Sequence, residues 1–262
     1  MIDIHSHILY GVDDGSPTIQ ETIKMLKIAV DEGIESIIAT PHYIIGANKY
    51  SKEELLIRYE EVCNVIQKEN IPIKLLLGNE LFADAMLPDK IVDEDCFSLS
   101  NSKYVLVEFS PRTAKYSVNN LIYSISLKGY IPIIAHPERT FAVKDIDDIL
   151  IELIKKGCFL QLNSGSITGI YGEKVKKMAL ELLERHMIHF IATDSHSSRR
   201  RSPRIIKAYK FVEDKYGKIY ANQLFNDNGL KVLNNSHIEY EEPKIKTNNG
   251  LIHKLKYIFN MN

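Results

Sequence analysis

Met1-Ile2-Asp3-Ile4-His5-Ser6-His7, the first stretch of the chain, has the alternating pattern of a β-strand. Successive side chains of a strand point to opposite faces, so His5 and His7 share one face while Ile2 and Ile4 share the other. Two neutral imidazoles side by side can begin a site for a divalent metal. Two histidines alone do not establish such a site, so the prediction depends on the rest of the chain.

The pattern of a short apolar strand followed by a longer helical stretch repeats along the chain. Strands are predicted at residues 2–7, 36–40, 73–77, 104–109, 131–135, 159–162 and 189–193. Helices are predicted near residues 18–32, 51–69, 116–128, 145–156, 172–186 and 203–216, with a further helical region near 219–233. Strands separated by helices pair in parallel through right-handed crossovers. Seven such units predict an α/β fold that closes, or nearly closes, into a barrel.

Composition and length indicate one globular domain followed by a tail. The 262 residues are 45% hydrophobic and 26% charged, and α/β barrels of this size form one domain. No linker-like composition occurs before about residue 236, so we expect a barrel over residues 1–236 and a C-terminal tail over 237–262 that is partly ordered or a packed helix. The net charge of −1 gives no attraction to nucleic acid.

The cysteines and the apolar runs bear on where the protein works. Cys63, Cys96 and Cys158 are scattered and odd in number, which suits a reducing cytoplasm. We find no signal peptide, and no run reaches the roughly 18 apolar residues of a membrane span. We therefore expect a cytoplasmic protein without a transmembrane segment. The sequence does not predict its oligomeric state. The basic and apolar segment 250–260 could touch a membrane or a partner, although a packed or frayed terminal helix is favoured.

Ligand-type side chains follow the apolar part of six predicted strands. Strand ends of a parallel barrel gather on one face, where active sites of such barrels lie. A single histidine at a strand end is usually an ordinary loop residue, but six independent occurrences are hard to explain in that way. The nine candidate metal ligands are His5, His7, Asp14, His42, Glu80, Glu108, His136, Asp194 and His196.

The donor set indicates both the kind of metal and the kind of substrate. Histidine and carboxylate without cysteine suit Mn²⁺, Zn²⁺ or iron. Nine ligands are too many for one ion, and a carboxylate such as Glu80 could bridge two. Three divalent ions would outweigh the four carboxylates in charge, which favours an anionic substrate such as a phosphate. Bound metal also lowers the pKa of water and can stabilise the oxygens of an in-line displacement.

Two arginines near the predicted ligands support a phosphate substrate. Arg139 lies three residues after His136, and Arg201 closes the run Arg199-Arg200-Arg201 after His196. A guanidinium matches the geometry of phosphate oxygens. The alternatives are a salt bridge of Arg139 with Glu138 or another nearby acid, and a solvated loop for the triple arginine.

The motifs together resemble the polymerase-and-histidinol-phosphatase superfamily, and within it the CpsB/YwqE-type manganese-dependent protein-tyrosine phosphatases of bacterial capsule and exopolysaccharide loci. The resemblance covers residues 1 to about 236 and implies a distorted seven-stranded (β/α) barrel with a trinuclear metal site. The motifs are the first seven residues, Asp13-Asp14-Gly15, Thr40-Pro41-His42, Gly78-Asn79-Glu80, Glu108-Phe109, Ala135-His136-Pro137-Glu138-Arg139 and Thr193-Asp194-Ser195-His196.

The resemblance also implies roles for individual residues. His5, His7, Glu80 and Asp194 would hold one ion, Glu80, Glu108 and His136 a second, and Asp14, His42 and His196 the third. Arg139 and Arg201 match the phosphate-binding arginines of the family. The implied cofactor is manganese, two to three ions, with zinc or iron as alternatives, and the implied partner is an autophosphorylating bacterial tyrosine kinase. The stretches 43–50 and 110–116 match less firmly and are expected to shape substrate entry.

Several alternatives stay open. A small-molecule phosphomonoesterase such as histidinol phosphatase, a non-catalytic binding module and a metal-dependent amidohydrolase share parts of the pattern. Asp13 could replace Asp14 as a ligand, and the segment Asn163-Ser164-Gly165-Ser166 could contact phosphate or form a turn. His186 and His189 are interpreted as structural. No cysteine begins the C-x5-R loop of thiol phosphatases, which argues against a covalent cysteine mechanism.

Overall fold

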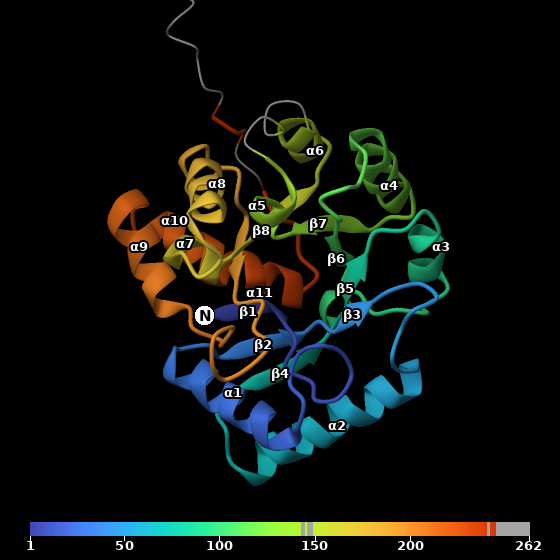
Figure 1. Ribbon diagram of the computed structural model, residues 1–262, viewed down its shortest axis with the longest axis vertical. Coiled ribbons are helices and arrows are strands. Elements are labelled where there is room, and N and C mark those ends of the chain that lie inside the picture. Colours follow the sequence, from blue (N-terminus) through green and yellow to red (C-terminus); the bar gives the residue numbers. More distant parts are fainter. Residues whose placement is uncertain (143–144, 146–148, 240–241, 245–262) are drawn as a thin grey trace, which may run out of the picture.

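The computed structural model describes residues 1–142, 145, 149–239 and 242–244. Its strands lie at the centre with helices around them, and every strand pair is parallel (Figure 1). One sheet has the order β1-β2-β4 and the other the order β3-β5-β6-β7-β8-β9. The strands are β1 (Ile2–Ser6), β2 (Ser36–Ala39), β3 (His42–Tyr43), β4 (Lys74–Leu77), β5 (Glu80–Phe82), β6 (Tyr104–Glu108), β7 (Ile131–Ala135), β8 (Phe159–Asn163) and β9 (Phe190–Ala192).

The two sheets meet at two places. Beside β9, the Asp194 N–H donates to the His5 carbonyl (2.9 Å) and the His7 N–H donates to the Ser195 carbonyl (2.8 Å). On the other side, β3 and β5 directly follow β2 and β4 in sequence, separated from them by two-residue interruptions such as Thr40-Pro41. The predicted parallel α/β architecture is confirmed. The hydrogen bonds define two sheets, and one closed ring of seven strands stays a prediction.

The helices connect successive strands. Two of them begin at side-chain caps: Thr18 accepts from the N–H of Glu21 ahead of α1, and Ser51 forms a capping box with Glu54 ahead of α2. Four short helices, α3, α5, α7 and the 3₁₀ turn η1 (Leu99–Asn101), were not predicted. The α-helices are α1 (Ile19–Asp31), α2 (Lys52–Lys68), α3 (Leu87–Val92), α4 (Lys115–Leu127), α5 (Pro137–Thr140), α6 (Ile151–Lys155), α7 (Ser164–Thr168), α8 (Glu173–Glu184), α9 (Ile206–Tyr216), α10 (Lys218–Asn222) and α11 (Asn228–Leu233), with a π-helical turn at Gln223–Asp227.

The hydrophobic core consists of two clusters, which together hold the strands and so fix the positions of their ends. Apolar side chains of six strands, among them Ile4 and Leu106, form one buried cluster at the centre, and a larger cluster fills the space between strands and helices. Burial on both faces is typical of parallel strands covered by helices. Ile238 joins the central cluster, and the Tyr104 hydroxyl donates to the Ser236 carbonyl (2.6 Å). The first residues of the predicted tail therefore pack on the fold, whereas 240–241 and 245–262 lie outside the described residues.

In the part of the chain that the structure describes, no helix combines the length and the apolar character needed to cross a membrane.

Candidate metal centre and phosphate site

Eight of the nine predicted ligands lie at or just beyond the carboxyl ends of the strands and Asp14 lies in the loop after β1, and they meet in one cluster that is buried at its centre and exposed at Asp14. Two of them have a left-handed backbone: His136 (φ 30°), directly after β7, and Asp194 (φ 50°), two residues after the end of β9. Such a conformation costs a non-glycine residue about 1–3 kcal/mol and persists where the surroundings enforce it, often at functional sites.

Glu80 lies at the centre of the cluster. Its carboxylate is 1% exposed and faces four imidazoles. The distances are 2.8 Å to His136 Nε2, 3.0 Å to His42 Nδ1, 3.2 Å to His7 Nε2 and 3.4 Å to His5 Nε2. One carboxylate among four imidazoles has the position of a bridge between neighbouring cations.

The three implied ligand sets each lie together. Asp194 Oδ1 is 3.6 Å from Nε2 of both His5 and His7. Asp14 Oδ1 is 3.4 Å from Nε2 of His42 and of His196. Glu108 Oε1 is 3.7 Å from His136 Nε2. The tightest groups, with ligand atoms within 4.8 Å of one another, are His7, Asp14, His42 and His196, then His5, His7 and Glu80, then His42, Glu80 and Glu108. His7 and His42 each belong to two of these three groups, so each lies between neighbouring groups of ligand-type atoms.

The donor atoms fit divalent cations. His42 Nδ1 is buried and makes no hydrogen bond, although carboxylate oxygens of Glu80 and Glu108 lie 3.0 and 3.8 Å away. Burial alone would lower the pKa of His42, but the carboxylates of Asp14, Glu80 and Glu108 raise it to about 11. Burial and the charge of Glu80 raise the pKa of Glu108. A cation among these groups would take the place of the protons that the carboxylates attract.

Hydrogen-bond partners orient the imidazoles from outside. His7 Nδ1 lies 2.6 Å from Asp13 Oδ2, and His5 Nδ1 lies 2.9 Å from Gln161 Oε1, which leaves Nε2 of both rings toward the centre. Asp13 also accepts from the N–H groups of Gly15 (2.8 Å) and His42 (3.1 Å). Asp13 therefore contacts the outer nitrogen of His7, whereas Asp14 faces His42 and His196, which favours Asp14 over Asp13 as the candidate ligand.

A glycine permits this loop to pass close to the strand. A Cβ at position 15 would lie 2.2 Å from the His7 carbonyl oxygen, a distance that no side chain tolerates. The motif Asp13-Asp14-Gly15 therefore combines an orienting carboxylate, a ligand-type carboxylate and a close backbone approach.

Both predicted arginines contact the cluster through Asp194. Arg139 Nη1 donates to Asp194 Oδ2 and Arg201 Nη2 to Asp194 Oδ1, each at 2.8 Å. The guanidinium-bearing side chains are 33% and 27% exposed, so they also face the opening of the site. Arg139 does not pair with Glu138, which accepts hydrogen bonds from Ser166 Oγ (2.6 Å) and the Asn163 N–H (3.1 Å).

Two contributors to the site, Tyr171 and Gln161, were missed from the sequence, and Asn163, which the sequence offered as a phosphate contact or part of a turn, contacts Asp194. Tyr171 places its ring 5.0 Å from the Arg139 guanidinium carbon, a cation–π distance. Asn163 Nδ2 donates to Asp194 Oδ2 (2.6 Å). Gln161 orients His5 from the interior of β8. The one available signal was the presence of two buried amides in an otherwise apolar strand, since a buried polar side chain needs a partner.

The residues set aside behave as structural ones. His189 is buried, accepts from the Leu160 N–H at Nδ1 (3.2 Å), and has its pKa lowered to about 3 by burial. His186 stacks on Tyr220. Burial raises the pKa of Cys63, Cys96 and Cys158, which opposes thiolate formation.

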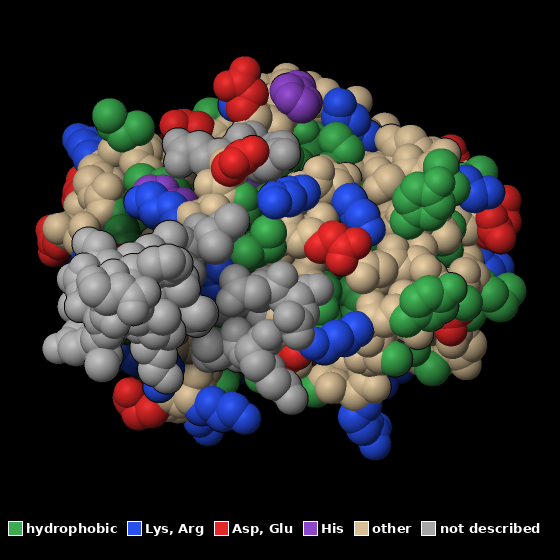
Figure 2. Space-filling model, turned by 90° about the horizontal axis from the view of Figure 1, so that it is seen from above, with side chains coloured by type: hydrophobic (Ala, Val, Ile, Leu, Met, Phe, Trp, Pro, Cys, Tyr) green, Lys and Arg blue, Asp and Glu red, His purple; other side chains and the backbone are tan. Residues whose placement is uncertain are grey.

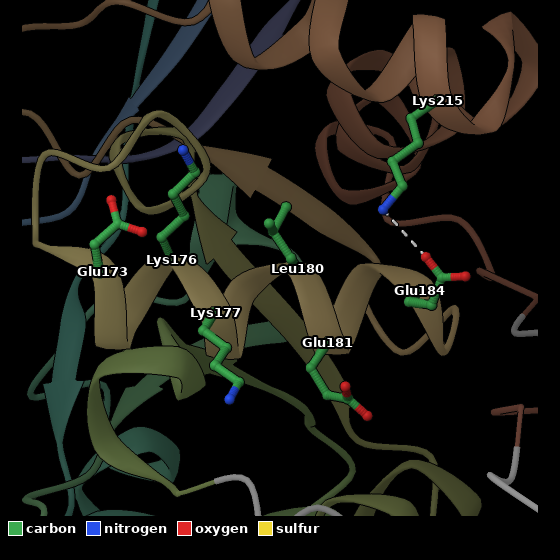
Figure 3. Close-up of a pocket in the computed structure, with 7 residues that line it drawn as sticks. All are labelled: Glu173, Lys176, Lys177, Leu180, Glu181, Glu184 and Lys215. Atoms are coloured by element: carbon green, nitrogen blue, oxygen red, sulfur yellow. Dashed lines mark ion pairs between the residues drawn. The ribbon is translucent and has the colours of Figure 1, made fainter.

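A separate hollow lies between α8 and α9, and none of the predicted site residues lines it (Figure 3). Lysine and glutamate side chains surround it, and Lys215 Nζ lies 3.2 Å from a Glu184 carboxylate oxygen. Such mixed charges around one leucine are typical of a solvated helix surface, so the chemistry is assigned to the cluster at the strand ends.

Comparisons with known proteins agree in length and in fold. Residues 1–234 match the family model "Capsular polysaccharide synthesis, CpsB/CapC". The chain is 34% identical over 244 residues to tyrosine-protein phosphatase YwqE of Bacillus subtilis (strain 168), covering 93% of this chain and 96% of that one. It is 35% identical over 245 residues to the putative tyrosine-protein phosphatase CapC of Staphylococcus aureus, covering 93% and 95%.

Solved structures extend this comparison. A crystal structure from work on YwqE of B. subtilis and CpsB of Streptococcus pneumoniae, described as metal-dependent tyrosine phosphatases, has a TM-score of 0.88 at 34% identity and covers 94% of this chain and 100% of that chain. Histidinol phosphate phosphatase of Lactococcus lactis has a TM-score of 0.51 at 18% identity, with 82% and 92% covered, which shows a common fold alone.

Proposed function

Because the chain belongs to the CpsB/CapC family of capsular polysaccharide synthesis proteins, we propose that it is a metal-dependent protein-tyrosine phosphatase. The observation that carries this proposal is the cluster of histidines and carboxylates around the buried Glu80, with two arginines bound to Asp194 beside it. Relatives that match over most of the chain carry the name tyrosine-protein phosphatase.

The nine residues are proposed to hold two to three divalent ions, with manganese as the expected metal and zinc or iron as alternatives. His5, His7, Glu80 and Asp194 would hold one ion, Glu80, Glu108 and His136 a second, and Asp14, His42 and His196 a third. When bound, such ions supply Lewis acidity and lower the pKa of water.

The protein's own groups then position the phosphate ester. Arg139 and Arg201 donate to its oxygens as paired guanidinium forks. A water oxygen bonds to phosphorus while the bond from phosphorus to the tyrosine oxygen breaks, and the electron pair leaves with the phenolate; one proton of the water stays on the phosphate and the other passes to bulk water. A phenol has a pKa of about 10, so its oxyanion departs with little protonation. We assign no proton donor to the leaving oxygen, which favours aryl phosphates over phosphoserine.

The finer predictions about fold and partner belong to the same proposal. The two sheets would act as one interrupted seven-stranded barrel over residues 1–236, since the hydrogen bonds of His5 and His7 join β1 to the end of β9. The substrate would be an autophosphorylating bacterial tyrosine kinase, met in the cytoplasm.

Phosphate release from a phosphotyrosine peptide tests the proposal. Mn²⁺ should stimulate the reaction, and a chelator or the substitution His136→Ala should abolish it. Histidinol phosphate and a phosphoserine peptide serve as competing substrates. Preferential turnover of histidinol phosphate would replace the proposal with a small-molecule phosphatase, and no turnover of any ester by the metal-loaded protein would reject phosphatase activity.

A further inference from the structure

An open groove lies beside α4, next to the candidate metal centre. Its volume is about 270 Å³, slightly below the usual range for pockets that enclose a whole small molecule. Figure 2 shows hydrophobic side chains on the right of the face seen from above, the side on which Figure 1 places α3 and α4. The groove is lined by Ala83, Asp84, Ala85, Phe109, Thr113, Tyr116, Ser117, Asn120, Leu121 and Ser124.

Residues that line the groove are direct neighbours of two candidate metal ligands. Phe109 directly follows Glu108, and the Ala83 N–H donates to the Glu108 carbonyl (2.9 Å). Ala83 also directly follows β5, the strand that begins with Glu80. If a substrate's phosphotyrosine is held at the metal centre, the polypeptide on one side of it would run past the ends of β5 and β6 into this groove.

The lining has the chemistry of a peptide-binding surface. The lining contains two buried apolar side chains, Phe109 and Leu121, together with Tyr116, which is 76% exposed. The hydroxyl and amide groups along α4 can donate to and accept from a peptide backbone. Asp84 supplies the one charged side chain in the lining, so nothing here selects a second phosphate or a nucleotide.

We propose that this groove binds the polypeptide that flanks the phosphotyrosine, with Tyr116 covering an apolar side chain of the substrate. The inference rests on the proposed phosphatase activity and adds the surface that separates a protein substrate from a small ester. An exposed tyrosine is a common anchor of protein interfaces because it buries a large area at low entropic cost.

A comparison of two exposed tyrosines on one helix tests the groove. Tyr116→Ala removes the cover, and Tyr123→Ala removes a tyrosine that is 60% exposed on α4 but does not line the groove. The substrates are a phosphotyrosine peptide of about twelve residues and para-nitrophenyl phosphate, which is too small to reach the groove. We expect Tyr116→Ala to raise KM for the peptide about five- to tenfold, with kcat and the para-nitrophenyl phosphate kinetics unchanged, and Tyr123→Ala to change neither.

A second groove variant and a binding assay keep the test decisive if Tyr116→Ala is misfolded or if the protein shows no activity. Ser124→Trp should fill the groove and raise the peptide KM in the same way. Equal changes on both substrates, or no change in the peptide KM for either groove variant, would overturn the inference. A change of oligomeric state between wild type and the groove variants in sedimentation, with unchanged peptide kinetics, would assign the groove to contacts between copies instead. If the wild type hydrolyses neither substrate, the proposed function fails, and fluorescence anisotropy of the labelled phosphopeptide against wild type and Tyr116→Ala still decides whether the groove binds it.

Discussion

Replacing Glu80 should damage the protein far more than replacing Asp14, although both are ligand-type carboxylates of the same cluster. Glu80 is 1% exposed and faces four imidazoles, whereas Asp14 is 60% exposed and faces two. Glu80→Gln and Asp14→Asn keep the shapes of the side chains and remove one negative charge each. The comparison therefore isolates burial and the number of contacts.

The expected stability losses follow from these environments. Removing one partner of a buried ion pair costs about 3–5 kcal/mol, and we expect the lower end for Glu80→Gln because the neighbouring imidazoles can release their protons. Removing an exposed carboxylate costs about 0–1 kcal/mol, which is the expectation for Asp14→Asn. Urea unfolding in the presence of a chelator measures both values without any contribution from metal.

Metal content supplies the second measurement. Loss of even an outer partner of a metal site reduces affinity about 10–100-fold, and a bridging ligand is lost to two ions at once. Glu80→Gln should therefore bind at least two fewer ions after dialysis, and Asp14→Asn at most one fewer. Elemental analysis and phosphatase kinetics of the two variants decide the matter. Equal unfolding free energies together with equal metal loss would refute the central position assigned to Glu80.

Three further predictions concern the arginines, the cysteines and a buried histidine. Arg139→Ala should keep its metals by elemental analysis and lose about 10²–10³-fold in kcat/KM, the effect of one charge-assisted contact to the transition state; unchanged kcat/KM would reject its role. Iodoacetamide should leave most activity intact, because burial raises the pKa of all three thiols, and stoichiometric inactivation would contradict this. His189 has a folded pKa of about 3 against 6.5 ordinarily, so the unfolded state binds more protons between these values and stability falls as pH falls below about 6.5. Between pH 7 and pH 5 this loss is about 2 kcal/mol, and His189→Asn in chelator should lack it; the same pH dependence in both proteins would exclude His189 as its source.

The strands are predicted well from the sequence because parallel strands are buried on both faces, so their sequences are continuous apolar runs. The run at 131–135 ends in His136, and the structure places strand and histidine as predicted. The strand continuations β3 and β5 were missed, since two or three residues carry no periodicity. Their hydrogen bonds depend on neighbouring strands far away in the sequence.

The candidate ligands were predictable and their supporting contacts were not. A histidine or acid after an apolar run is a local signal, whereas the partner of His5, Gln161, lies 156 residues away. The same holds for Tyr171, which follows α7 and reaches Arg139 only through the fold. Local sequence thus indicates which groups are candidate ligands, and tertiary packing determines how each of these side chains is oriented.

Asp194 links the metal cluster to the phosphate site through one side chain. Its Oδ1 accepts from Arg201 at 2.8 Å and also lies 3.6 Å from Nε2 of His5 and of His7. The same carboxylate accepts from Arg139 at Oδ2 (2.8 Å), so Asp194 positions both guanidinium groups beside the imidazoles of His5 and His7. If His5, His7 and Asp194 hold a cation as proposed, the carboxylate would be shared between that cation and the two arginines. The arginines would then keep positive charge to offer to a phosphate oxygen.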